Sequence, residues 1–234
     1  MASRIKEFLE TASGNGHAKV ATAERKVAIQ VKALKEGLLY CRIVGTAPYM
    51  QQAFSMKQQL KMKGKQEEGP TGKGKKVREK RDFKANYEEA THWMLDGKGR
   101  KVPGISCCAI RSAMVSACRT TDLKMTFAKQ AILGVIPDGH EIETNLPLFK
   151  IIGKREMNIA PARNTNGGMD LRSRPLWRQW HADIVIRYDA DMMTETDIAN
   201  LLYRAGQQVG IGEGRPDSRD CCGIGFGLFR VEGR

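Results

Sequence analysis

The sequence predicts an α+β fold whose core elements follow the order strand, helix, strand, strand, helix, strand. Residues 180–189 alternate between apolar and polar side chains, which is typical of a strand with one buried face. Residues 194–206 begin with a capping threonine and carry an apolar stripe at helical spacing. A glycine-rich stretch, residues 209–227, then leads into a last short strand. With right-handed crossovers, this order builds a four-stranded antiparallel sheet with two helices on one face.

The first core strand and the first core helix are predicted from two apolar patterns. Residues 38–44 are apolar on both faces and stop at Gly45, which favours a central strand over an edge strand. We expect Ser106 to cap the helix that follows, with Arg111 on its exposed side. Its buried side has apolar residues spaced three and four apart: Ile110, Ala113, Met114 and Ala117.

The two middle strands are predicted at residues 131–136 and 146–152, both of which are apolar. A turn at Pro137-Asp138-Gly139 separates them, so we expect them to form a hairpin. Together with the elements above, they describe a ferredoxin-like, or RRM-like, βαββαβ core.

The domain organisation follows from where the core elements begin and end. Residues 1–36 are interpreted as an N-terminal helical arm, because Ile5, Phe8, Leu9 and Ala12 share one helical face. Within that arm, residues 18–36 fit a strand as well as a helix. Residues 37–234 are interpreted as one ferredoxin-like domain with a flexible basic insertion at residues 51–100 and a hairpin insertion at residues 137–178.

The charge of the chain points to a polyanionic partner. Lys and Arg number 39 against 26 Asp and Glu, which gives a formal net charge of +13 and an isoelectric point near 9.6. Residues 57–84 hold 11 Lys and Arg and 4 Asp and Glu, so this stretch alone carries +7. Its glycines are expected to break any regular structure. The candidate nucleic-acid contacts there are Lys61, Lys63, Lys73, Lys75, Lys76, Arg78, Lys80 and Arg81; the alternative is a solvated loop that keeps the protein soluble.

Several classes of protein are not expected. We find no long apolar run, no signal-peptide pattern and no lipidation motif, so we expect a cytoplasmic protein without a membrane partner. The six cysteines include no C-x-x-C pair, and the four histidines lie far apart in the sequence. We therefore expect reduced thiols, no metal site and no cofactor.

The glycine-rich stretch is the most informative motif. It follows a helix and opens a strand, whereas a dinucleotide-binding loop follows a strand and opens a helix. Glycines let backbone amides approach a phosphate closely, and Arg215 and Arg219 add charge from the same loop. The glycines concerned are Gly210, Gly212, Gly214, Gly223 and Gly225. The alternative is a structural loop whose glycines only permit tight turns.

A second basic stretch precedes the clearest strand. Arg172, Arg174 and Arg178 are interleaved with Trp177, so arginine planes and an indole could stack on unpaired bases. Trp180 falls on the buried face of its strand and is expected in the core. The alternative is a loop whose arginines pair with nearby acids.

Two motifs give the sequence a resemblance to the RAMP superfamily, the CRISPR-associated RNA-binding proteins built on ferredoxin-like folds. One is the Gly-x-Gly, polar stretch, Gly-x-Gly pattern of residues 210–227 before the last strand, and the other is Pro103-Gly104-Ile105-Ser106 with Arg111. The resemblance implies that Arg111, Arg215, Arg219 and the glycine-rich loop hold a nucleic-acid backbone, and that the lysine-rich insertion acts as a flexible thumb. The C-terminal third also resembles bacteriophage proteins encoded among replication and recombination genes, which implies the host cytoplasm as the setting.

The leading hypothesis is a non-catalytic protein that coats single-stranded RNA or DNA and forms homo-oligomers along it. No acid occurs in residues 46–55, where the resemblance would place a target-cleaving aspartate, so we expect no nuclease activity. One alternative is a RAMP-type endoribonuclease that uses His92 or His140. Another is a phage protein whose basic face binds a host defence protein.

Overall fold

The structure is a computed structural model that describes residues 31–54, 56–67, 82–163, 169–218 and 224–233. The chain divides into two compact units, Met1–Ala33 and Leu34–Arg234. Every helix and strand described below belongs to the second unit. The predicted N-terminal arm lies outside the described residues as far as residue 30.

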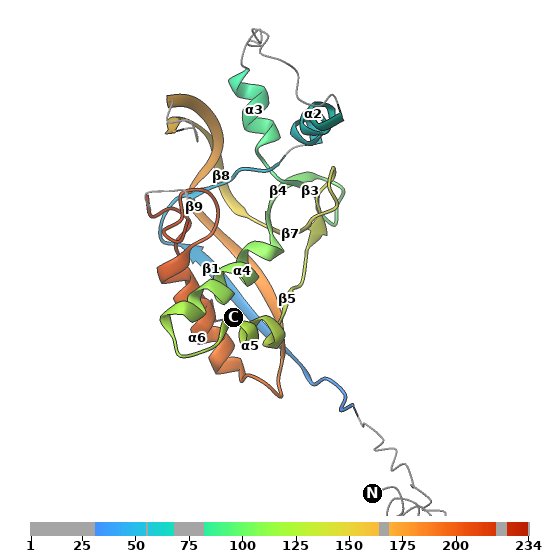
Figure 1. Ribbon diagram of the computed structural model, residues 1–234, viewed down its shortest axis with the longest axis vertical. Helices are drawn as coiled ribbons and strands as arrows, with labels where there is room; N and C mark the ends of the chain where they lie inside the picture. Colours follow the sequence, from blue (N-terminus) through green and yellow to red (C-terminus); the bar gives the residue numbers. More distant parts are fainter. Residues whose placement is uncertain (1–30, 55, 68–81, 164–168, 219–223, 234) are drawn as a thin grey trace, which may run out of the picture. The chain divides into compact units, whose positions relative to one another are not determined.

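The main sheet is antiparallel and brings together strands from both ends of the second unit (Figure 1). At its centre, β1 (Glu36–Gly45) pairs with β10 (Phe229–Gly233) on one side and with β9 (Met169–Asp189) on the other. β9 also pairs with β5 (Ile132–Val135), which gives the order β10-β1-β9-β5. The predicted α+β class is therefore confirmed, and so are the strands at residues 38–44 and 180–188.

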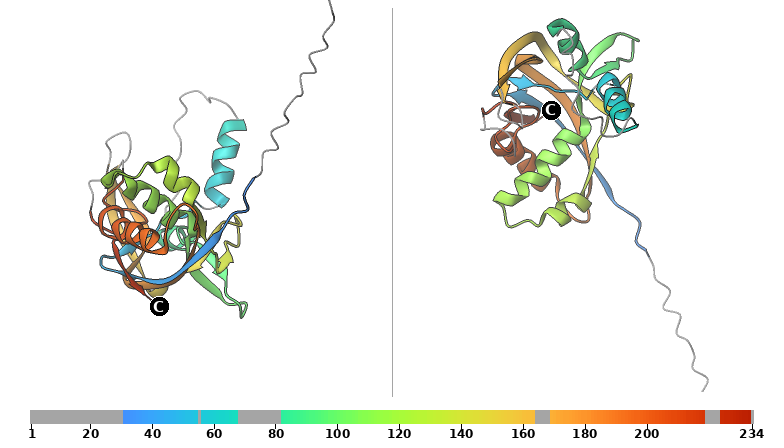
Figure 2. Two further views of the ribbon diagram at one scale, coloured as in Figure 1. Left: turned by 90° about the horizontal axis from the view of Figure 1, so that it is seen from below. Right: turned by 45° about the horizontal axis from the view of Figure 1, so that its top comes forward.

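Three helices cover one face of this sheet (Figures 1 and 2). They are α4 (Cys107–Ala117), α5 (Met125–Ala131) and α6 (Glu195–Arg204), with a 3-10 turn at Cys118–Thr120 and a π-helical turn at Ala205–Val209. α6 begins as predicted, because Thr194 and Asp197 form a reciprocal capping box. The buried faces of the helices and of β1 and β9 form one core, which includes Ile43, Ile110, Met114, Ile186 and Leu202.

The opposite face of the main sheet is open to solvent along β1. Leu39, Cys41 and Ile43 are buried against the helices, so the residues between them point the other way. Tyr40 is 54% exposed on this outward face. Residues 38–44 are apolar on both faces and so predict a central strand. β1 is central, between β10 and β9, but only one of its faces is buried.

A long two-stranded ribbon continues from the main sheet. The 21 residues of β9 pair in their first half with β8 (Ile152–Arg163), and β2 (Tyr49–Met50) lies along the other edge of that half. A second, smaller sheet has the order β3-β4-β7-β6, formed by β3 (Trp93–Leu95), β4 (Lys101–Ser106), β7 (Pro147–Lys150) and β6 (Gly139–His140).

The predicted hairpin between residues 131–136 and 146–152 is wrong. β5 pairs with β9, whereas β7 pairs with β4 and β6. The turn at residues 137–139 redirects the chain into the second sheet, where the Asp138 carboxylate accepts a hydrogen bond from the Lys150 amide at 2.8 Å. Alternating apolar residues predict a strand but carry no information about its partner.

Within its described residues, the basic insertion contains two helices, α2 (Met56–Glu67) and α3 (Phe83–Glu89). The prediction that residues 57–84 have no regular structure is therefore wrong for α2, which runs through Gly64. Lys, Gln, Met and Leu are good helix formers, and one glycine costs only about 1 kcal/mol. α3 begins at Asp82, whose carboxylate accepts from the Lys84 and Ala85 amides.

Candidate nucleic-acid interface

The glycine-rich loop follows the π-helical turn and packs against β2 and the residues just before it. Gly210, Gly212 and Gly214 all have positive φ angles, which favour glycine. A Cβ atom at Gly212 would lie 2.4 Å from the Met50 carbonyl oxygen, and one at Gly227 would lie 1.7 Å from that of Ile211. Close packing therefore explains these two glycines. At Gly225, which also has a positive φ angle, a Cβ atom would meet nothing within 4 Å.

Along the start of the loop, amides that donate a hydrogen bond alternate with amides that do not. The Ile211 amide donates to the Gly227 carbonyl at 3.0 Å, and the Glu213 amide donates to the Met50 carbonyl at 2.9 Å. The Gly212 and Gly214 amides have no hydrogen-bond partner within the part of the chain that the structure describes, but Gly212 is half-buried and Gly214 is buried. Of the two, the Gly212 amide is the candidate to bind an anion. Arg219 and Gly223 lie outside the described residues.

Arginines of the two predicted basic segments hold the loop in place. Arg215 donates to the Gly212 carbonyl at 3.0 Å, and Arg174 forms a mostly buried ion pair with Glu213, with Nε to Oε2 at 2.8 Å. Arg174 therefore fits the alternative interpretation, in which these arginines pair with nearby acids. Arg178 pairs with Glu156 at 3.0 Å but stays exposed. Arg172 lies opposite Ala160 in the ribbon.

Trp177 is not a surface residue. Its side chain is fully buried, and its ring centroid lies 5.6 Å from that of Tyr49. The prediction that Trp177 stacks on bases is therefore wrong. The reason is an irregularity in β9, where the neighbouring residues 178 and 179 are both exposed and both tryptophans turn inward. The expectation that Trp180 is buried is confirmed.

Ser106 has the N-cap position predicted for it but makes no capping bond, and Arg111 is bound to neighbouring elements. Arg111 donates to the carbonyls of Ile132 at 2.9 Å and Lys129 at 2.6 Å, so it joins α4 to β5 and α5 instead of lying free on the helix surface. Ser106 occupies the N-cap position of α4, but its side chain makes no capping bond. It lies within β4, opposite Leu148 of β7, and the sheet pairing fixes its backbone.

Part of the basic insertion can be located. Lys63 lies one turn from Glu67 on α2, with Nζ to Oε1 at 3.7 Å. Lys61 is also on α2. Two large apolar residues of this helix, Leu60 and Met62, are exposed. Lys73, Lys75, Lys76, Arg78, Lys80 and Arg81 lie outside the described residues.

The uncovered face of the main sheet is a candidate surface that the sequence reasoning missed. Tyr40 lies opposite Val185 on it, between two cross-strand ion pairs. Arg42 and Asp183 form one pair, with Nε to Oδ1 at 2.8 Å, and Arg187 and Glu36 form the other at 2.7 Å. The signal was the alternation of Leu38, Tyr40 and Arg42 with buried residues, which places an aromatic ring and a guanidinium on one open face.

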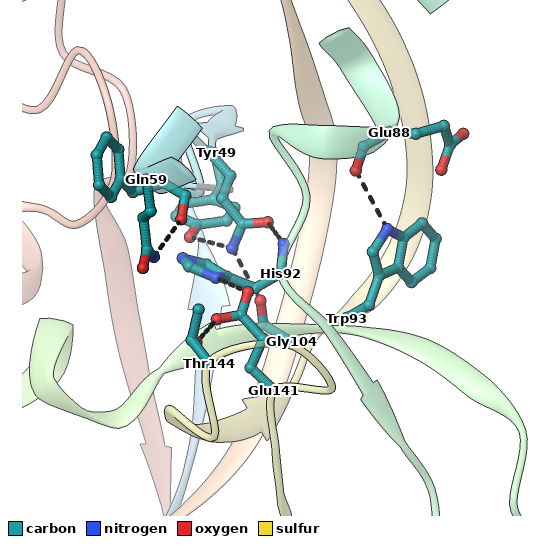
Figure 3. Close-up of polar contacts among 10 residues, drawn as sticks. Tyr49, Gln59, Glu88, His92, Trp93, Gly104, Glu141 and Thr144 are labelled. Carbon is teal, nitrogen blue, oxygen red and sulfur yellow. Dashed lines mark hydrogen bonds and ion pairs between the residues drawn. The ribbon is translucent and has the colours of Figure 1, made fainter. Parts of the chain in front are cut away.

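A second polar cluster joins the insertion to the small sheet (Figure 3). His92 Nδ1 lies 2.5 Å from Glu141 Oε1, and Thr144 donates to the other oxygen of that carboxylate. Both members of the pair are mostly buried. Gln51 accepts from the His92 amide at 3.0 Å and donates to the Gly104 carbonyl at 2.8 Å. His92 thus has a carboxylate that orients its ring, whereas His140 is exposed on β6.

Arg155 of β8 holds the insertion against the ribbon. Its guanidinium carbon lies 4.2 Å from the centre of the Tyr87 ring and 4.4 Å from that of Trp93. It also donates to Glu88 at 2.7 Å and to Thr91 at 2.9 Å. The part of the insertion that leads into β3 is therefore fixed on the main body by one cation.

No family model matches this sequence, and the search of curated proteins finds no match either. Among the described residues, no group of three or more His, Cys, Asp or Glu side chains could hold a metal ion. None of the described helices combines the length and the apolar character needed to span a bilayer.

Proposed function

We propose that this protein binds single-stranded nucleic acid, and RNA in particular, without cutting it. The observation that carries the proposal is the uncovered face of the main sheet, where Tyr40 is exposed between Arg42 and Arg187. An aromatic ring on an open sheet is a platform for an unpaired base, and such stacking contributes about 1–3 kcal/mol per base. The net charge of +13 supplies the long-range attraction.

The order of the elements supports a ferredoxin-like, or RRM-like, fold. In the strand order β10-β1-β9-β5, each strand is antiparallel to its neighbour, and α4 and α6 connect strands that are not adjacent. A split βαβ arrangement of this kind has its helices on one face and leaves the other face free. The proposal includes membership of the RAMP superfamily, for which the sequence motifs remain the support.

The glycine-rich loop would bind the phosphate backbone beside the sheet. The Gly212 amide is the available donor, and Arg215 keeps the loop in the conformation that presents it. The lysines and arginines of residues 57–84 would neutralise further phosphates. Copies of the protein would assemble along the strand, in the cytoplasm of a phage-infected host.

The test is salt-dependent binding to labelled single-stranded RNA, single-stranded DNA and duplex, measured by fluorescence anisotropy. Tyr40→Ala should weaken single-strand binding about tenfold, because it removes one stacking ring, and Tyr40→Phe should keep most of the affinity. Tyr203→Ala is the matched control, because Tyr203 is equally exposed at 54% but lies on α6, on the helical side of the molecule.

Two results would contradict the proposal. One is equal and weak binding to single strands and duplex, which would favour a protein partner. The other is an equal decrease in affinity in Tyr40→Ala and Tyr203→Ala. Light scattering with and without a long oligonucleotide then tests the assembly of copies along the strand.

The His92–Glu141 contact favours a second candidate function, RNA cleavage by general acid–base catalysis. A carboxylate at 2.5 Å fixes the tautomer of the ring, as such catalysis requires. If the protein cleaves RNA, His92→Ala should abolish the activity and Glu141→Gln should reduce it, whereas His140→Ala should change little. Intact RNA after prolonged incubation with the wild-type protein removes this candidate.

A further inference from the structure

A cleft of about 640 Å³ opens on the uncovered face of the main sheet, where the end of β1, the start of β8 and the middle of β9 meet. Its wall includes a row of side chains across three strands, because His181 pairs with Val44 on one side and with Ile152 on the other. Paired residues in adjacent strands point to the same face, so this row lies on the same side of the sheet as Tyr40.

Two glycines line the cleft at positions that have no room for a side chain. A Cβ atom at Gly45 would lie 2.2 Å from Nε1 of Trp180, and a Cβ atom at Gly153 would lie 2.4 Å from the Gln179 carbonyl oxygen. Gly153 also has a φ angle of 152°, and the pairing of β8 with β9 shifts between Gly153 and Arg155. Any side chain at either position would displace its neighbour, so both backbone segments that line the cleft here require glycine.

The bulge places a cation at the rim. The strand pairing skips Lys154 in β8 and both Arg178 and Gln179 in β9. The side chain of Lys154 is 86% exposed and that of Arg178 is 68% exposed. Both cations share one acid, Glu156, at 3.4 Å from Lys154 Nζ and 3.0 Å from Arg178 Nε. These hydrogen bonds, Arg178 first, lower the pKa of Glu156 and keep it ionised. Counting histidine as uncharged, two cations and one carboxylate leave +1, which matches the single charge of one phosphodiester.

We propose that this cleft binds one nucleotide of the single strand, with its phosphate between Lys154 and Arg178 and its base over the floor formed at Gly45 and Gly153. Gln179 also lines the cleft and is exposed, so its side-chain amide can donate to and accept from a base edge. This inference rests on the proposed function, because it takes the nucleotide to belong to the strand that stacks on Tyr40.

The first test compares oligonucleotide affinities by anisotropy at constant salt. Lys154→Ala/Arg178→Ala should weaken binding about tenfold, because neither cation can then bind the phosphate. Lys98→Ala/Lys129→Ala is the control for charge alone, since it removes two exposed cations outside the cleft and should change affinity by less than about twofold. Glu156→Gln should strengthen binding, because it frees both cations from a competing acid.

The second test locates the base directly. An oligonucleotide that contains 4-thiouridine is cross-linked to the protein by light, and the modified peptides are identified by mass spectrometry. We expect cross-links within residues 152–156 or 178–181. The inference is overturned if the cleft variant behaves like the charge control and the cross-links map elsewhere, while Tyr40→Ala still weakens binding; the proposed function then stands without this site.

The reverse outcome, in which the proposed function fails and the cleft still binds a nucleotide, can also be recognised. If the wild-type protein binds no single strand, the proposed function fails, and uridine 5′-monophosphate is then titrated with NMR detection. Chemical-shift changes around His181 that disappear in Lys154→Ala/Arg178→Ala would retain the cleft as a nucleotide site. The absence of any such change would overturn it.

Discussion

The two tryptophans of β9 differ in what the indole N–H does. Trp180 donates to the Ala47 carbonyl at 2.9 Å, whereas the buried Trp177 N–H has no hydrogen-bond partner among the described residues. Trp180→Phe should therefore cost about 1–2 kcal/mol more than Trp177→Phe, because it leaves a carbonyl unpaired and Trp177→Phe removes an unpaired donor. Urea denaturation of both variants measures the difference, and the reverse ranking would contradict these hydrogen-bond assignments.

Glu141 should make stability depend on pH. Burial, the largest effect, raises its pKa, but hydrogen bonds from His92 and Thr144 together outweigh burial, so the pKa lies below its ordinary value of 4.5. A carboxyl whose pKa falls on folding stabilises the protein above that ordinary value and loses the contribution as the pH falls through the folded-state pKa. The wild-type protein should therefore lose more stability than Glu141→Gln below about pH 4.5.

Urea midpoints measured between pH 7 and pH 3 test this expectation. At pH 7, Glu141→Gln should be less stable by about 1–2 kcal/mol, because His92 loses its charged partner. The two stability curves should converge as the pH falls. Parallel curves over the whole range would show that Glu141 does not change its protonation on folding in the way described.

Among the elements, the insertion depends on Arg155 for its attachment to the ribbon. The guanidinium is mostly buried between Tyr87 and Trp93 and carries the ion pair with Glu88. Arg155→Ala should destabilise the protein by about 2–4 kcal/mol, since it removes cation–π interactions and leaves buried polar groups unpaired. Arg155→Lys should recover only part of this stability, because an ammonium lacks the planar fork of the guanidinium.

Hydrogen exchange shows whether that destabilisation is local. In Arg155→Ala, amides of α3 and β3 should exchange faster, while those of β1 and the second half of β9 stay protected. Uniformly faster exchange would mean that the insertion and the main sheet unfold together. Lys101→Ala is a control at the same ring, because Lys101 Nζ lies 4.6 Å from the centre of the Trp93 ring but Lys101 is exposed to solvent.

Elements whose own residues show a helical or strand periodicity could be predicted from the sequence. Features that depend on contact with another segment of the chain could not. The α6 stripe and the alternation from residue 180 onward are local patterns, and both were correct. β8 was missed although it pairs with the next strand in the chain, because residues 153–156 show no apolar alternation and the pairing shifts between Gly153 and Arg155. The glycine-rich loop was located correctly, but only the structure shows that Gly212 is needed for its close approach to Met50.

For the molecule as a whole, the sequence predicted a net positive charge but not which surface carries it. On the uncovered sheet face, Arg42, Arg187 and Arg230 each pair with an acid, so that face carries little net charge. Much of the excess lies instead in residues 57–84, at +7 of +13. Stacking and long-range attraction thus belong to different segments of the sequence, which an argument from overall composition treats as one.

This separation predicts that affinity and salt dependence can be changed independently. Replacing Lys73, Lys75, Lys76, Arg78, Lys80 and Arg81 with glutamine should reduce the slope of log affinity against log salt by about 0.7 for each phosphate that is no longer neutralised. Tyr40→Ala should lower affinity at every salt concentration and leave the slope unchanged, because stacking releases no counterions.

Combining the two sets of changes tests whether they act separately. If stacking and phosphate neutralisation occur at distant sites, their free-energy effects at one salt concentration should add within about 0.5 kcal/mol. Anisotropy titrations of both variants and of their combination, over a range of salt concentrations, provide the slopes and the sum. A large coupling would instead place the insertion over Tyr40 in the complex, so that the segment and the ring hold the same nucleotides.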